Sequence, residues 1–187
     1  MKTKEIIDHI KKWLISYNKS SKAKGFIIGI SGGIDSAVTS TLLAQTKLPL
    51  LCLEMPIHQN SSQVSRGKKH IKWLEKKYEN VSSLEIDLTD LFESFKKISN
   101  TENQDTNLAL ANTRSRLRMT TLYYNAQINN YLVAGTGNKV EDFGIGFYTK
   151  YGDGGVDISP IADLLKSEVF HLGKVLGIIN EILIAPP

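Results

Sequence analysis

Apolar and polar positions along the chain fall into blocks that predict helices and strands in turn. From Ile6 to Tyr17 apolar residues recur at helical spacing, so we expect an opening amphipathic helix that ends before the polar stretch 18–24. Four short runs then predict strands, the first of them buried, because each is bounded by glycine, proline or polar residues. These runs cover residues 26–30, 50–55, 81–87 and 131–135.

Helical spacing returns between the predicted strands, over residues 36–45, 61–78 and 107–130, with a short helix expected through Phe92 and Phe95 and a final one over 163–176. Strands that alternate with helices favour right-handed crossover units, so we predict the α/β class: a doubly wound parallel sheet with helices on both faces. We expect a single domain over residues 1–187. Seven glycines between positions 135 and 160 predict a long loop region at the carboxyl edge of the sheet, where such folds bind ligands.

Composition and charge narrow the class of protein. No apolar run approaches the roughly 20 residues that span a bilayer, and the N-terminus lacks the apolar stretch of a secretory signal, so we expect a cytoplasmic protein. The formal charge of +4 is modest and the lysines are dispersed among acidic residues, so we do not expect nucleic-acid binding. The single cysteine, Cys52, lies in an apolar run and is expected to be a buried thiol rather than a nucleophile or a metal ligand.

Candidate chemistry begins where the first predicted strand meets the next helix. The backbone N–H groups of such a turn and the dipole of the helix point into one concavity, which makes an anion site. Serine and aspartate beside the glycines make a plain tight turn the weaker explanation. The candidate phosphate loop consists of Gly29, Ile30, Ser31, Gly32, Gly33, Ile34, Asp35 and Ser36.

Three types of phosphate loop compete for this segment. A Walker A loop requires Gly-Lys-Ser/Thr, and no lysine follows Gly33. A dinucleotide-binding loop requires Gly-x-Gly-x-x-Gly, which the segment lacks, although Glu54 lies near the place of the ribose-binding acid, so this loop type is the second interpretation. Asp35 argues against it, because a carboxylate beside a phosphate is repulsive unless a divalent cation lies between them. We therefore expect Mg²⁺ at this loop.

The Ser-Gly-Gly-x-Asp-Ser pattern at 31–36 resembles the pyrophosphate loop of the N-type ATP pyrophosphatases, which is the third type. Other segments resemble the NAD synthetase family within that superfamily: 115–119 (Ser-Arg-Leu-Arg-Met), 135–138 (Gly-Thr-Gly-Asn), Glu141, and 147–160 with its Thr-Lys pair and Gly-Asp-Gly-Gly turn. The resemblance extends from the loop nearly to the last residue. It implies the adenine nucleotide α-hydrolase-like fold, a Rossmann-like arrangement.

The resemblance also implies roles for individual residues. Two carboxylates with phosphate oxygens form the oxygen-rich shell that Mg²⁺ prefers, and a guanidinium suits phosphate or carboxylate. The implied assignments are the loop residues, Thr136 and Lys166 for ATP, Asp35 and Glu141 for the metal, Arg116, Lys150 and Asp157 for deamido-NAD, and Asp153 for ammonia or a second metal, with Asp153 and Lys166 taken as catalytic.

Helical geometry separates the three arginines near position 116. Arg116 shares a face with Asn112 and Met119, whereas Arg114 and Arg118 lie one turn apart on roughly the opposite side. One arginine can therefore face the sheet edge, and the resemblance favours Arg116.

The implied reaction is the ATP- and Mg²⁺-dependent amidation of deamido-NAD by ammonia, through an acyl-adenylate, to NAD, AMP and pyrophosphate. Some relatives make ammonia from glutamine in a separate domain for which this chain has no room, so we expect free ammonium or a separate glutamine amidotransferase to supply it. The resemblance also implies a homodimer in which two subunits form the dinucleotide site.

Relatives continue past the position of Pro187 and often carry a phosphate-contacting serine there, so we expect this domain to lack the family's C-terminal segment. Three other interpretations stay open: an ATP pyrophosphatase with a different acceptor, a non-catalytic nucleotide-binding module, and a dinucleotide-binding oxidoreductase.

Overall fold

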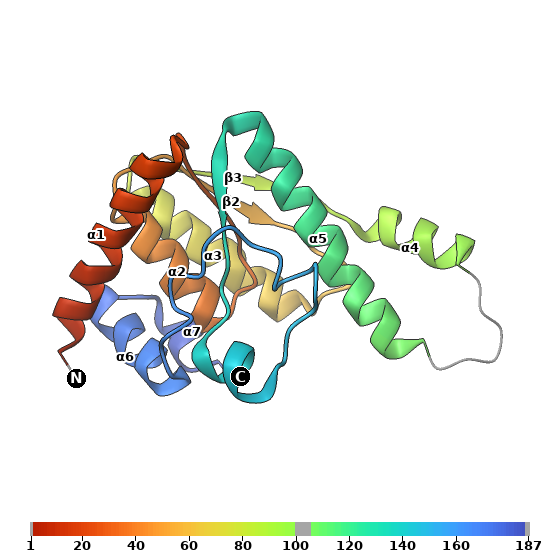
Figure 1. Cartoon of the computed structure of the whole chain (residues 1–187). Helices are drawn as coiled ribbons and strands as arrows, with labels where there is room; N and C mark the ends of the chain where they lie inside the picture. The colour runs from red at the N-terminus through yellow and green to blue at the C-terminus, as the bar shows by residue number, and fades with distance from the viewer. Residues whose placement is uncertain (1, 100–105, 186–187) are drawn as a thin grey trace.

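The computed structural model describes residues 2–99 and 106–185, and within them a four-stranded parallel sheet forms the centre of the molecule (Figure 1). Strand β1 lies inside the sheet, where Phe26 is in register with Leu50 of β2 and Leu132 of β4. The strand order is β3-β2-β1-β4, so the order reverses at β1 and a crevice is expected outside its carboxyl end. The strands are β1 (Gly25–Gly29), β2 (Leu50–Glu54), β3 (Val81–Glu85) and β4 (Tyr131–Ala134).

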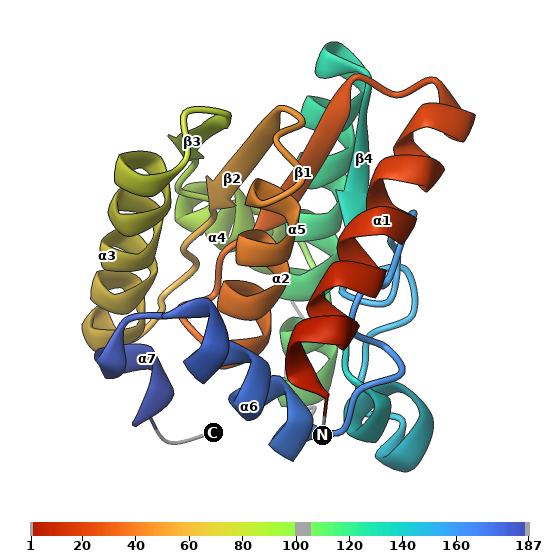
Figure 2. The same ribbon diagram turned by 90° about the vertical axis from the view of Figure 1, so that its left-hand side faces the viewer.

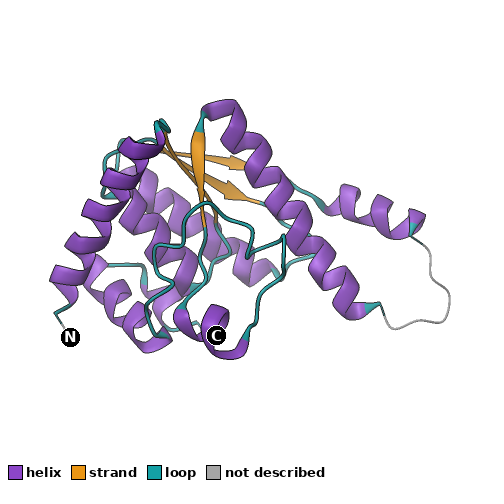
Figure 3. Ribbon diagram, in the orientation of Figure 1, coloured by secondary structure: helices purple, strands orange, loops and turns teal. Residues whose placement is uncertain are grey.

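Helices cover both faces of this sheet, as Figures 2 and 3 show. One face carries α1 (Thr3–Ser21), α2 (Ile34–Ala44), α3 (Ser61–Lys77), α6 (Lys166–Leu176) and α7 (Asn180–Leu183). The other face carries α4 (Thr89–Ile98) and α5 (Asn107–Asn129). A π-helix, η1 (Val140–Ile145), follows β4. The predicted doubly wound α/β architecture is confirmed.

Side chains alternate between the two faces of the sheet along β1, so this strand contributes to the hydrophobic core on each face. Phe26 and Ile28 are fully buried against the α1–α2–α6 side, whereas Ile27 is fully buried against the α4–α5 side. A strand that is apolar on both faces is typical of a parallel sheet between two helix layers. Cys52 is also fully buried, as predicted, and burial raises the pKa of its thiol to about 12, so the thiol stays protonated at neutral pH.

Most predicted elements are confirmed to within two residues at each end, but the end of α1 was wrong. Helix α1 continues through Asn18 to Ser21 and ends at Lys22, whose φ is 60°. Asn18 is tolerated inside the helix because its side-chain amide donates to the Gly25 carbonyl at 3.2 Å. A polar residue that looks like a loop position in sequence therefore joins α1 to the start of β1.

The segment 135–160 is not a continuous loop, because η1 interrupts it. Asn138 is fully buried, and its side-chain oxygen accepts hydrogen bonds from the N–H groups of Val140 and Glu141 at 3.0 and 3.2 Å. Gly146, with φ of 65°, ends the π-helix.

Near the end of the described chain, one predicted helix needs correction and one helix was not predicted. Helix α6 begins at Lys166 rather than at residue 163, since the Glu168 carboxylate accepts the Leu165 N–H at 2.8 Å and fixes the first turn there. The short helix α7 was not predicted. None of the helices in the described ranges is both long enough and apolar enough to cross a membrane.

Candidate active site

The predicted phosphate loop joins β1 to α2 at the carboxyl edge of the sheet. Gly32 has φ of +78°, and a Cβ at this position would collide with the Gln63 carbonyl of α3, so only glycine fits both the backbone angle and the close packing. Gly33 is the residue before α2, and the first amides of α2 have no partner inside the helix. The loop therefore leads directly into the N-terminus of α2, a position whose free amides suit an anion.

Two serines fix the shape of this loop. The hydroxyls of Ser31 and Ser36 lie 3.1 Å apart, and the Ser36 hydroxyl also donates to the Gly33 carbonyl at 3.1 Å. The Ser31 hydroxyl accepts the Gly33 N–H at 3.2 Å, while the Ser36 hydroxyl accepts the Ser31 N–H at 3.3 Å. Bonds within the loop thus hold its curvature in the free protein.

A charged cluster lies beside the loop and unites three predicted residues from distant parts of the chain. The ammonium group of Lys166, at the start of α6, donates to the carboxylate of Asp35 and to Oε1 of Glu141, the latter at 3.1 Å. Burial disfavours the charged lysine, but the hydrogen bonds and charges of the two acids prevail and raise the pKa of Lys166 above its usual value. The two carboxylates therefore converge on a single positive charge.

Asn138 links the segments that carry the two acids of this cluster. The sequence analysis gave this residue no role beyond its place in a motif. Its side chain is fully buried and donates to Asp35 Oδ1 at 2.9 Å, while its carbonyl oxygen holds the first turn of η1, which carries Glu141. One amide thus fixes both acids. The signal that could have found it is a polar residue in the first turn of chain after a strand, four residues past Ala134, since that segment lies at the sheet edge.

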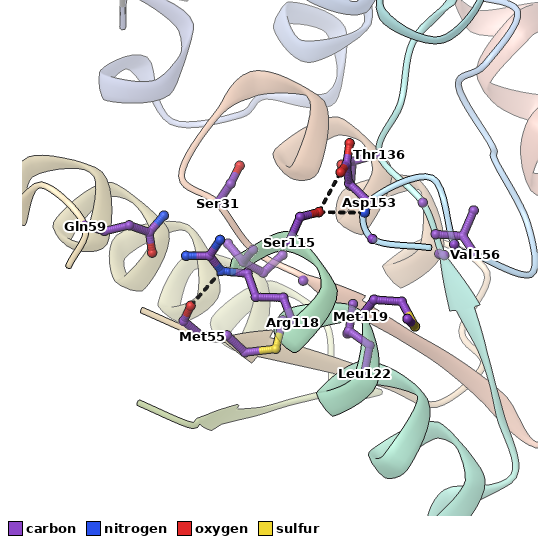
Figure 4. A pocket seen from close by; sticks show the side chains of 16 residues that line it. Ser31, Met55, Gln59, Ser115, Arg118, Met119, Leu122, Thr136, Asp153 and Val156 are labelled. Carbon is purple, nitrogen blue, oxygen red and sulfur yellow. Dashed lines mark hydrogen bonds between the residues drawn. The ribbon is translucent and has the colours of Figure 1, made fainter. Parts of the chain in front are cut away.

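A cavity of about 310 Å³ opens beside the loop, where the ends of β1 and β4 face α5 (Figure 4). Its walls are apolar at Ile30, Met55, Met119, Leu122 and Val156, and polar groups are contributed by Ser31, Gln59, Ser115, Arg118, Thr136 and Asp153. Apolar walls with a few polar groups suit a small organic ligand. Thr136, which follows β4, lies on the wall of this cavity, and its contact with ATP stays a prediction.

Of the arginines on α5, the one that lines the cavity is Arg118. The assignment of Arg116 to deamido-NAD, which the resemblance implied, stays a prediction. Arg118 donates from Nε to the Met55 carbonyl at 2.9 Å, and its terminal nitrogens point toward Gln59 and Ser31 (Figure 4). Burial, and then the charge of Arg114, lowers the pKa of Arg118 below its usual value, although arginine stays charged at neutral pH. Which arginine faces the cavity depends on how α5 is rotated about its own axis where it packs on the sheet.

The predicted dinucleotide residues are exposed, Arg116 on α5 and the other two on the loop after η1. Arg116 is exposed and donates to the Lys150 carbonyl at 3.2 Å, and the Lys150 ammonium lies 5.1 Å from the centre of the Tyr151 ring. The carboxylate of Asp157 accepts from the Tyr123 hydroxyl at 3.0 Å, which ties the loop to α5. Arg116 and Lys150 are thus in direct contact, Asp157 is held to α5 two turns farther along at Tyr123, and none of the three lines the cavity.

Asp153 lies on the cavity wall, held by α5. Its Oδ1 accepts the Ser115 hydroxyl at 2.6 Å and the Thr149 N–H at 3.0 Å, and its own N–H donates to the Ser115 hydroxyl at 2.8 Å (Figure 4). A second cavity of about 240 Å³ adjoins the first and is also lined by Asp153, together with Asp142, Phe143 and Tyr148. Burial, and then the charges of Glu141 and Asp153, raises the pKa of Asp142.

Two expectations concern residues away from this site. Glu54, the acid of the dinucleotide-binding alternative, is 5% exposed and packs beside Gly67 of α3; it does not line the cavity. Burial raises the pKa of Glu54. Pro187, where relatives were expected to carry a serine, lies outside the described residues.

Comparison with known proteins gives one consistent family. The family model described as NAD synthase matches residues 6–187. The chain is 39% identical over 190 residues to the NH(3)-dependent NAD(+) synthetase of Mesoplasma florum, and the match covers 100% of this chain and 75% of that protein.

Two solved structures extend the comparison. NMN synthetase from Francisella tularensis is similar with a TM-score of 0.91 and 36% identity, over 100% of this chain and 76% of that one. The NH3-dependent NAD synthetase from Campylobacter jejuni is similar with a TM-score of 0.87 and 30% identity, over 98% of this chain and 77% of that one.

Proposed function

Because this chain belongs to the NAD synthase family, we propose that it catalyses the ATP-dependent amidation of deamido-NAD by ammonia, forming NAD, AMP and pyrophosphate. It is a ligase of NAD biosynthesis that forms a carbon–nitrogen bond. The observation that carries the proposal is the convergence of Asp35, Glu141 and Lys166 beside the phosphate loop and its cavity. Free backbone amides, a lysine and a metal ion held by carboxylates are groups that stabilise the charge on a departing pyrophosphate.

The carboxylate pair fits a magnesium ion. Both acids contact the ammonium group of Lys166, so their oxygens face a common point. The described residues contain no group of three or more His, Cys, Asp or Glu side chains that could hold a metal, so a metal here would have two protein ligands. Mg²⁺ is commonly held by one or two carboxylates, with phosphate oxygens and water as the other ligands. We propose that Asp35 and Glu141 hold it, where its charge offsets that of the ATP phosphates.

The first half of the proposed reaction makes the carboxylate reactive. A carboxylate oxygen of deamido-NAD attacks the α-phosphorus of ATP, the P–O bond to the β-phosphate breaks, and pyrophosphate leaves. The amides at the start of α2 and the Lys166 ammonium, released from the acids, stabilise the charge on pyrophosphate. Ser31 and Ser36 keep the loop curved for this purpose.

The second half replaces AMP by ammonia. The nitrogen lone pair attacks the acyl carbon, the bond from carbon to the AMP oxygen breaks, and the extra proton leaves the nitrogen. We assign acceptance of that proton to Asp153, whose carboxylate lies on the cavity wall. Arg116, Lys150 and Asp157 are proposed to bind deamido-NAD.

We further propose that the protein acts as a homodimer through α4 and α5. Apolar side chains are exposed on both helices, with Ile98 85%, Leu108 75% and Ile128 64% exposed. A second copy of the chain covering these helices would also lie beside the exposed Arg116, in keeping with a dinucleotide site shared by two subunits. Light scattering checks this: a dimer that Ile128→Lys converts to monomer supports it, and a monomer at all concentrations contradicts it.

A second candidate product is NMN, since the Francisella tularensis structure, at 36% identity, bears the name NMN synthetase. The two candidates differ in the substrate, nicotinate mononucleotide or deamido-NAD, and both carry the same reacting carboxylate. The ratio of kcat/KM for the two substrates decides between them.

The test of the proposed function is release of AMP and pyrophosphate from ATP and Mg²⁺, with deamido-NAD and ammonium supplied together and each omitted in turn. Release that depends on deamido-NAD, together with NAD formation that depends on ammonium, supports it. ATP cleavage indifferent to deamido-NAD would favour another acceptor, and ATP binding without cleavage would favour a non-catalytic module. The cytoplasmic location and the source of ammonia stay predictions.

A further inference from the structure

Ser115 makes a short hydrogen bond between α5 and the loop that carries Asp153. The serine hydroxyl donates to Asp153 Oδ1 at 2.6 Å and accepts the Asp153 N–H at 2.8 Å, so one hydroxyl uses its single proton and a lone pair on the same residue. Both the backbone and the carboxylate of Asp153 are thereby fixed relative to the helix (Figure 4). Within the described chain, no hydrogen bond is formed by the other carboxylate oxygen, Oδ2.

The backbone is built for this contact. Gly152 is buried against α5, and a Cβ on it would collide with the Ser115 hydroxyl. Glycine at 152 therefore allows the loop to approach close enough for the hydroxyl to reach two atoms of Asp153.

Two further contacts hold the same loop independently of Ser115. The Thr149 hydroxyl donates to the side-chain oxygen of Asn112 at 2.8 Å, and Arg116 Nε donates to the Lys150 carbonyl at 3.2 Å. Loss of the Ser115 hydroxyl should therefore leave the loop attached to α5 and alter chiefly the placement of the Asp153 carboxylate.

Asp153 stands where the two cavities share a wall. The larger cavity is lined by Ser31 and Thr136 on the side of the phosphate loop, and the smaller by Asp142 and Tyr148 on the other side. With the acyl carbon in the larger cavity, as the proposed function requires, a group at this boundary faces it from the side away from the phosphate loop.

We infer that Ser115 is a positioning residue for the ammonia half of the reaction: it fixes Asp153 at the boundary between the two cavities, so that Oδ2 is free to accept the proton lost from the attacking nitrogen. The inference rests on the proposed function. No chemical step is assigned to Ser115 itself, and the proton passes from nitrogen to Asp153 and then to water.

The test separates the two halves of the reaction in Ser115→Ala. Exchange of labelled pyrophosphate into ATP, with deamido-NAD present and ammonium absent, reports the first half, and kcat/KM for ammonium reports the second. We expect exchange within about twofold of the unchanged protein and a fall of about tenfold or more in kcat/KM for ammonium, the effect of losing one hydrogen bond to a charged group. Ser115→Thr, which keeps the hydroxyl, should restore the rate to within about threefold.

A matched control and a double variant make the test specific. Thr120→Ala removes a hydroxyl from the same helix whose hydrogen bond, to the Arg116 carbonyl at 3.0 Å, stays inside the helix, and it should change neither half. Asp153→Asn should lower the ammonium step by about 10²-fold, and adding Ser115→Ala to it should cost nothing more, because Ser115 acts through Asp153.

Three outcomes would overturn the inference. Equal losses in both halves for Ser115→Ala would mean a general structural role, and effects of Ser115→Ala and Asp153→Asn that multiply would mean that the two residues act independently. Absence of exchange in the unchanged protein would overturn the proposed function and the inference together. The measurement on the unchanged protein therefore separates a failure of the proposed function from a failure of the inference alone.

Discussion

Replacing Lys166 by methionine removes the ammonium group that joins Asp35 to Glu141. The side chains of Lys166 and Glu141 are 31% and 35% exposed and that of Asp35 is 16% exposed, so solvent screens part of the interaction. A hydrogen bond to a charged group contributes about 1.5–3 kcal/mol. Screening reduces this, but the two carboxylates are also left facing each other, so we expect a loss of about 1–2 kcal/mol in the free energy of unfolding without metal.

For a domain of this size such a loss lowers Tm by about 2–8 °C. The same substitution should strengthen magnesium binding. In the unchanged protein the cation must displace the lysine from the acids, whereas in Lys166→Met the lysine no longer competes with it. Added Mg²⁺ should therefore raise the Tm of the variant more than that of the unchanged protein, by the mass-action effect of tighter binding.

The assay is thermal unfolding by calorimetry with and without Mg²⁺, at constant ionic strength and without ATP. Lys174→Met, an exposed lysine on the same helix, is the matched control and should change Tm little. Equal responses of Lys166→Met and Lys174→Met to Mg²⁺ would refute the assignment of Asp35 and Glu141 as the metal pair.

Three further predictions concern the site and its surroundings. Asn138→Ala should lower the free energy of unfolding by about 2–3 kcal/mol in urea titrations, because a fully buried amide loses three partners. Gly32→Ala should abolish ATP binding by calorimetry, whereas Gly177→Ala, with a similar φ of +74° but open space around it, should only reduce stability. Burial, and then the hydrogen bond to Asp157, raises the pKa of Tyr123 to about 12, above the usual 10, so its contribution is complete below pH 10 and is lost between pH 10 and 12. Between pH 10 and 12 the free energy of unfolding should fall by about 1 kcal/mol, a value reduced to allow for solvent screening. Tyr123→Phe should not show this fall.

Local patterns explain why much of the fold was predictable. The apolar run of β1, the glycines after it and the apolar face of α2 are neighbours in sequence, so periodicity and loop chemistry indicated the phosphate loop directly. The opposite holds for Asn18 and Asn138. Each is a buried amide whose partner, Gly25 or Asp35, comes from another element, and a polar residue shows nothing in sequence of a partner that only the fold supplies.

The choice between arginines shows a second limit. Helical geometry correctly separated Arg116 from Arg118, but it could not say which side of α5 faces the cavity, because that depends on how the helix packs on the sheet. The π-helix η1 was missed for a related reason. Glycines in 144–146 resemble a loop, and the turn forms because Asn138 holds its first amides.

The central claim, that the substrate carboxylate is adenylated before ammonia attacks, is tested most directly with ¹⁸O. Deamido-NAD labelled in both carboxylate oxygens is turned over with ATP, Mg²⁺ and ammonium, and the phosphate products are examined by mass spectrometry. An acyl-adenylate predicts a single ¹⁸O in AMP for each NAD formed and none in pyrophosphate, because the carbon–oxygen bond to AMP is the one that breaks. Unlabelled AMP, or ADP formed with ¹⁸O in orthophosphate, would contradict the account.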